Sequence, residues 1–229
     1  MYNLILILIN NVNKIFIPLF VKYKMFNLLS FLFILNLKKI TRIAPKKKIK
    51  YRAIVLYRSG GVDDLIESQK KYNPNILYLN CNRVFFKHIF FTFLNKKSHR
   101  YFNDNDYTSR NNEINNLKIK YKNFLITFLE ILKKKYAFNI FIGFNYGYFA
   151  EIELGKACNK LKIPFLILLK ERVTTELHNK YLTYALKKNQ MSKFYKIAVY
   201  SDYIKEELIK SNIVDKESVV VTGCSRLST

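Results

Sequence analysis

The chain has 229 residues, of which 50% are hydrophobic, including 17 Tyr and 19 Phe, so its composition excludes a disordered protein. This length suffices for one buried core with a short appendage. The formal net charge of +24 predicts an anionic partner, either nucleic acid or acidic phospholipid, although an AT-rich coding sequence would also enrich Lys without any binding role.

The first 50 residues form a basic, apolar N-terminal extension. They contain ten Lys or Arg, and no Asp or Glu occurs before Asp63. Within residues 1–37, Lys14, Lys22 and Lys24 separate apolar blocks that fall short of the roughly 18 to 20 uncharged residues of a spanning helix. The pattern predicts a pair of helices lying on an anionic membrane surface. Packing of these residues on the core and a true membrane span are the alternatives.

Residues 51–229 are predicted to form one α/β domain. Short, nearly continuous apolar runs alternate with helical periodicity, which is typical of a parallel sheet covered on both faces. We therefore expect a Rossmann-like open parallel sheet of about six strands, joined by right-handed βαβ crossovers. The expected strands are residues 53–57, 76–79, 140–144, 165–169, 197–200 and 219–222.

Helical stripes lie between these strands. One runs from Ile114 to Ile131 and another from Ala150 to Leu161, with apolar side chains at three- and four-residue steps. Ser201 is the expected N-cap of a later helix. The polar residues 95–112 are expected to form a surface loop.

The first candidate ligand site follows the first strand, because ligands of open parallel sheets bind at the carboxyl ends of strands. Ser59, Gly60 and Gly61 form a glycine turn at a helix start, where backbone N–H groups could bind a phosphate or carboxylate. The alternative is a tight strand-to-helix connection.

A second candidate follows residues 140–144. Asn145 and Tyr146 could form an amide and aromatic rim for a sugar, or Asn145 could simply cap the next helix.

The third candidate is the charged run after residues 165–169. Lys170 could pair with a phosphate, and Glu171 could orient a hydroxyl or act as a catalytic base. The alternative is a surface ion pair between them. A further strand leads to Gly223 and Arg226, and we expect Arg226 to bind substrate at a hinge.

No metal or cofactor is expected. The turn at Gly60 and Gly61 is neither GxGxxG nor a P-loop. The three cysteines (Cys81, Cys158 and Cys224) and the three isolated histidines (His88, His99 and His178) form no metal-ligand pattern. The widely spaced cysteines also indicate no disulfide framework, so a reducing compartment is expected.

Two stretches carry a resemblance to a known family. NIFIGFNYGYFAEIELGKACNKLKIPFLILLKE and KIAVYSDYIKEELIKSNIVDKESVVVTGCSRL resemble the N-terminal domain of GT-B-fold surface-carbohydrate biosynthesis proteins. These are similar to CDP-glycerol glycerophosphotransferases and, more distantly, to sugar-nucleotide 2-epimerases. In that family a Lys-Glu pair follows a core strand after an Ile-Pro lead-in, here Ile163 and Pro164. The family's VTGxxRxD segment has Ser228 in place of its Asp here.

The resemblance implies a glycosyltransferase-like or glycerophosphotransferase-like protein of capsule, lipopolysaccharide or related bacterial polymer synthesis. Its substrates would be a nucleotide-activated sugar or polyol and a lipid-linked or glycan acceptor, at the cytoplasmic, inner face of the cell membrane. The sequence lacks the family's second, nucleotide-binding domain, so the chain is expected to be the acceptor-side half and inactive alone. The alternatives are a non-catalytic remnant and a subunit working with a separately encoded second half. A nucleic-acid-binding protein is the least favoured alternative, because the aromatic residues fall mainly in apolar strand and helix positions.

Overall fold

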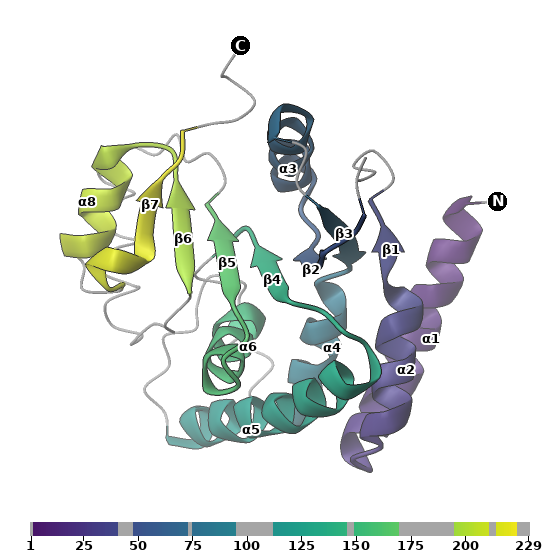
Figure 1. Cartoon of the computed structure of the whole chain (residues 1–229). Coiled ribbons are helices and arrows are strands. Elements are labelled where there is room, and N and C mark those ends of the chain that lie inside the picture. The colour runs from purple at the N-terminus through teal and green to yellow at the C-terminus, as the bar shows by residue number, and fades with distance from the viewer. Residues whose placement is uncertain are drawn as a thin grey trace.

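The computed structural model is an α/β fold built on one mostly parallel sheet (Figure 1). It describes residues 2–40, 48–72, 75–94, 112–145, 149–169, 195–210 and 214–223. The strands are β1 (Lys38–Lys39), β2 (Tyr51–Leu56), β3 (Ile76–Cys81), β4 (Ile140–Gly143), β5 (Phe165–Leu168), β6 (Lys196–Val199) and β7 (Val219–Val221). The helices are α1 (Tyr2–Lys22), α2 (Phe26–Asn36), α3 (Ser59–Tyr72), α4 (Val84–Phe93), α5 (Asn112–Lys135), α6 (Phe149–Lys160) and α8 (Asp202–Lys210), with a short 3-10 helix at Lys216–Ser218.

The predicted parallel α/β sheet is confirmed. Each of the six expected strands is present within two residues of its predicted ends. The described part of the sheet has one further strand, β1, which pairs antiparallel with β3 through Lys38 and Lys39. Its two lysines carry no apolar pattern, so hydrophobic periodicity could not reveal it.

The predicted helical stripes are also present. Tyr121, Phe124 and Phe128 of α5 and Ala150 and Leu154 of α6 are buried. The Ser201 Oγ accepts a hydrogen bond from the Ile204 N–H at 3.4 Å at the start of α8, as expected of an N-cap. Of the expected surface loop, residues 95–111 lie outside the described residues, and Asn112 begins α5.

Strand order places a topological switch point between β2 and β4. The sheet order is β1-β3-β2-β4-β5-β6-β7, so the chain moves from β2 to β3 and then returns to β4 on the other side of β2. The β2–β4 pairing aligns Val55 with Ile142. Chain crossovers leave the sheet on opposite faces here, and the carboxyl ends of strands at such a point are where ligands of open α/β sheets commonly bind.

The two faces of the sheet are covered unequally. Alternate side chains of β2 point to opposite faces, so Ala53 and Val55 pack with α3, whereas Ile54 and Leu56 join the larger core on the other face. This larger core contains residues of α4, α5, α6 and α8. Because right-handed crossovers reverse side when the strand order reverses, only α3 among the described helices packs on its face.

The helix pair α1–α2 adds an outer layer to the larger core, along one side of the molecule in Figure 1. Ile17 and Val21 of α1 and Leu29 and Phe33 of α2 are buried. The Phe33 ring lies 5.0, 5.7 and 5.8 Å from three other Phe rings, those of Phe85, Phe86 and Phe128. The inner face of this helix pair therefore packs on the core. Of the helices that the structure describes, none combines the length and apolarity needed to cross a bilayer.

Candidate functional site

The sequence-predicted turn after the first strand lies at the switch point. Ser59, Gly60 and Gly61 form the first turn of α3, and the Val62 N–H donates to the Arg58 carbonyl oxygen at 3.0 Å. A Cβ added to Gly61 would overlap the ring of Phe144, which directly follows β4. The glycine therefore allows the start of α3 to approach the end of β4, and this packing supports the tight-connection reading of the turn.

The second predicted segment meets the first at this point. Asn145 is half-buried and follows Phe144 at the end of β4, so the residues after β2 and those after β4 lie together. Tyr146 lies outside the described residues, as do Lys170, Glu171 and Arg226. The roles expected for those four residues stay predictions.

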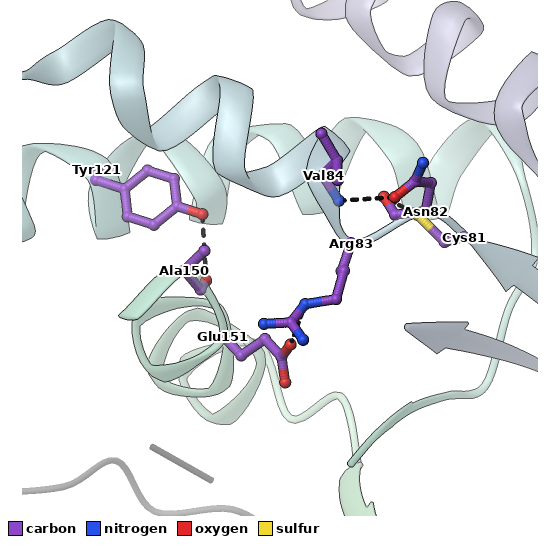
Figure 2. A network of polar contacts seen from close by, with 7 residues as sticks. All are labelled: Cys81, Asn82, Arg83, Val84, Tyr121, Ala150 and Glu151. Carbon is purple, nitrogen blue, oxygen red and sulfur yellow. Dashed lines mark hydrogen bonds and ion pairs between the residues drawn. The ribbon is translucent and has the colours of Figure 1, made fainter. Parts of the chain in front are cut away.

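A buried carboxylate that the sequence analysis did not single out lies beside this meeting point. Glu151, in the first turn of α6, is 2% exposed. Its Oε1 lies 3.5 Å from the Arg83 Nε, whereas its Oε2 is buried and accepts no hydrogen bond from the part of the chain that the structure describes (Figure 2). A Cβ on Gly143 would lie 3.3 Å from that Oε2. The carboxylate therefore lies over the last residue of β4.

Two arginines from other parts of the chain bring positive charge to this carboxylate. Arg83 lies in the turn between β3 and α4, and Arg58 lies two residues after the end of β2. We call Arg58, Arg83 and Glu151 the switch-point cluster. Its members come from the carboxyl ends of three neighbouring strands, β3, β2 and β4.

Burial dominates the electrostatics of the cluster. It raises the pKa of Glu151 to about 7, and the positive charges of Arg83 and, to a smaller extent, Arg58 only partly oppose this rise. The acid and the carboxylate are therefore both populated near neutral pH. A buried carboxyl group with such a pKa beside the strand ends of an open sheet is a candidate functional group.

Hydrogen bonds fix the surrounding elements (Figure 2). The Asn82 Oδ1 accepts from the Val84 N–H at 3.0 Å, which orders the turn around Arg83 immediately before α4. The fully buried Tyr121 hydroxyl of α5 donates to the Ala150 carbonyl oxygen at 3.2 Å, next to Glu151. The backbone next to Arg83 and the backbone next to Glu151 are thus each fixed by a hydrogen bond from a neighbouring side chain.

A signal for these residues was present in the sequence. Arg83 lies two residues after the end of β3, and Glu151 lies in the first turn of the helix after β4, so both residues follow strand ends. The site residues predicted from the sequence follow β2, β4, β5 and β7, and none of them follows β3. Nothing local shows, however, that the two side chains meet.

A separate groove of about 780 Å³ runs along the α3 face of the sheet. Its wall is largely apolar, with Ile142, Leu166 and Leu168 from the strands. The Tyr200 hydroxyl donates to the Asp64 Oδ2 at 2.8 Å across it. Its described lining includes Asp64 and Glu67 but neither Lys nor Arg, so the groove suits hydroxyl-bearing groups better than phosphates.

The described residues contain no group of three or more His, Cys, Asp or Glu that could hold a metal ion. Comparisons with protein-family models, curated proteins and solved structures find no match to this chain. Its function must therefore be inferred from the chemistry of these residues.

Proposed function

We propose that this chain is a glycosyltransferase-like or glycerophosphotransferase-like protein of bacterial surface-polysaccharide synthesis. Its switch-point cluster would bind the phosphate of a nucleotide-activated sugar or polyol, or of a phosphate-linked acceptor. The observation that carries the proposal is the pairing of Arg83 with a buried Glu151 whose pKa is about 7, beside Arg58. The resemblance of residues 139–171 and 196–227 to GT-B proteins supports the choice of substrate class.

Arginine is the appropriate residue for this role. Its planar guanidinium offers five N–H donors and can bind a phosphate through two parallel hydrogen bonds. The Arg83 side chain is 20% exposed, so part of it faces solvent while Nε faces Glu151. Backbone N–H groups at the start of α3 add a favourable partial charge for the same anion.

Glu151 is proposed as a positioning residue. Its side chain is 3% exposed, so a substrate does not reach it directly, and its Oε1 instead orients the Arg83 guanidinium beside the strand ends. A bound phosphate would place negative charge near Glu151 and so favour its protonated form. Phosphate binding near neutral pH should therefore be accompanied by proton uptake.

Calorimetric titration of the full chain with CDP-glycerol and with UDP-glucose tests the proposal. Arg83→Gln and Arg58→Gln should each weaken binding of whichever ligand binds by about 10- to 100-fold, the range expected for a charge-assisted hydrogen bond. Arg52→Gln is the matched control, because Arg52 lies in β2 near its amino end, where it donates to the Ala137 carbonyl oxygen at 3.3 Å. The control should bind as the wild type does.

Proton uptake gives an independent readout. The diphosphate of either ligand does not titrate near neutral pH, so heats measured in buffers of different ionisation enthalpy report protonation of the protein. The wild type should take up a fraction of a proton per ligand just above pH 7, and Glu151→Gln should take up none. Absence of binding by both ligands, or binding that is indifferent to both arginine substitutions, would refute the proposed site.

A further inference from the structure

The α1–α2 pair has a second, outward face that the core does not use. Apolar side chains on it are strongly exposed, with exposed fractions of 67% for Ile15, 59% for Phe31 and 60% for Leu35. We call this surface the outer face; its apolar members are Ile15, Phe16, Leu19, Tyr23, Met25, Leu28, Phe31 and Leu35. A single exposed hydrophobic residue needs no explanation, but a row of them on two adjacent helices marks an interaction surface.

The outer face is held in place by the opposite side of the same helices. Asn13 and Asn36 are buried and exchange two amide hydrogen bonds, at 2.9 and 3.2 Å, which join α1 to α2. Ile17, Val21 and Phe33 anchor the pair in the core. The exposed residues are therefore presented by a fixed helical layer, and their apolar character is not needed to attach it.

The charges of this region have one sign. Lys14, Lys22 and Lys24 are exposed on α1 and the turn after it, and the sequence has no Asp or Glu before Asp63. Exposed apolar side chains and lysines on the same helix pair match an anionic lipid surface, where acyl chains receive the apolar groups and headgroups receive the ammonium groups.

A groove beside the turn between α1 and α2 has the same dual chemistry. It has a volume of about 640 Å³ and is walled by Pro18, Leu19, Phe93 and Phe124, among others. Lys22 and Lys24 also line it. An acyl chain in this groove would place an anionic headgroup near two ammonium groups.

We propose that the outer face of α1–α2 binds the surface of an anionic lipid bilayer without crossing it. A second copy of this chain is a poorer occupant, since two outer faces would bring Lys14, Lys22 and Lys24 of both molecules together with no carboxylate from residues 1–62 to pair with them. A nucleic acid would leave the apolar side chains without a partner. This proposal does not depend on the phosphate site, which lies on other elements.

Vesicle flotation of the full chain is the direct test. The protein should float with vesicles that mix phosphatidylcholine and phosphatidylglycerol, should not float with phosphatidylcholine alone, and should be released as salt is raised. Phe31→Ser combined with Leu35→Ser should reduce the bound fraction at limiting lipid about tenfold, and Lys14→Glu combined with Lys22→Glu should do the same.

The matched control is Tyr203→Ser combined with Val220→Ser. Tyr203 on α8 and Val220 on β7 are 51% and 42% exposed, and they lie at the opposite end of the sheet. This control should float as the wild type does. Circular dichroism and urea unfolding should show that all these variants keep the wild-type fold, because the replaced side chains point away from the core.

Two outcomes would overturn the proposal. One is flotation that does not require phosphatidylglycerol or that survives the outer-face substitutions. The other is a dimer in light scattering that Phe31→Ser with Leu35→Ser converts to a monomer, which would assign the face to a second copy. Binding of CDP-glycerol or UDP-glucose by the outer-face variants separates this proposal from the proposed function, since those variants should retain it.

Discussion

The Nε of Arg83 lies 3.5 Å from the Oε1 of Glu151, joining the turn after β3 to the first turn of α6 (Figure 2). This ion pair does not compensate for burial of the carboxylate, because the pKa of Glu151 is raised to about 7 even with Arg83 beside it. Ionisation of Glu151 at the carboxyl edge of the sheet therefore destabilises the folded state. This destabilisation makes the cluster sensitive to pH and to the removal of either partner.

The stability of the folded chain should fall as pH rises through the titration of Glu151. The carboxyl group keeps its proton up to about pH 7 in the folded state but loses it near the ordinary value of 4.5 in the unfolded state. Between these values the folded state binds more protons, so the free energy of unfolding decreases with rising pH, by a total on the order of 3 kcal/mol. Urea unfolding between about pH 5 and pH 8 measures this slope.

Glu151→Gln should remove this contribution, and Glu130→Gln, which removes an exposed carboxylate of α5, is the matched control variant. The half-buried His88 contributes in the opposite sense, because burial, Lys14 and Lys87 lower its pKa, so only the difference between wild type and Glu151→Gln isolates the carboxylate. Equal slopes for the two proteins would show that Glu151 is not perturbed.

Removing the cations should raise the pKa of Glu151 further. Arg83 and Arg58 both oppose the effect of burial, and Arg83 does so more strongly. Arg83→Gln should therefore shift the titration to higher pH by more than Arg58→Gln does. Carboxyl-carbon NMR of the glutamates follows this directly, with Arg52→Gln as the control that should not move the titration. A smaller effect of Arg83→Gln than of Arg58→Gln would contradict the geometry.

Gly61→Ala should destabilise the fold by roughly 1–3 kcal/mol, since the new methyl group would overlap the Phe144 ring and force it or α3 to move. Phe144→Leu alone should also destabilise, because it leaves a gap among buried side chains. The double variant should be more stable than the sum of the two single effects predicts. A double-mutant cycle from chemical unfolding provides the measurement, and strict additivity would mean that the two residues do not interfere.

Asn36→Ala should cost about 1–3 kcal/mol, because the buried Asn13 amide loses both of its partners on α2. Replacing Asn13 and Asn36 together by Leu should cost much less, since no polar group is then left unsatisfied. Thermal unfolding of the single and double variants compares these values. If the double replacement is as damaging as the single one, shape and not hydrogen bonding maintains the contact.

Much of the fold was predictable because its signals are local. The six parallel strands are continuous apolar runs bounded by turns, and the apolar stripes of α5 and α6 repeat at the helical period. The spacing of the residues that need burial therefore indicates which segments are strands and which are helices. Residues 1–37 likewise carried enough apolar character to predict helices. Their sequence could not decide between packing on the core and lying on a membrane surface, because apolar side chains occur on both sides of each helix. In α1, for example, Ile17 is buried and Ile15 is 67% exposed.

The sequence by itself determined that this chain is a basic α/β protein with glycine and charged residues after its strands. Only the tertiary structure decided that β4 pairs with β2, that Phe144 lies against Gly61, and that Arg83 meets Glu151. The residue pattern of a helix or strand shows which of its sides is buried. The order of strands in the sheet depends instead on how the helices that connect them pack against the sheet and against one another. The raised pKa of Glu151 has the same origin, because it arises from burial in the tertiary structure and not from any neighbour in the chain.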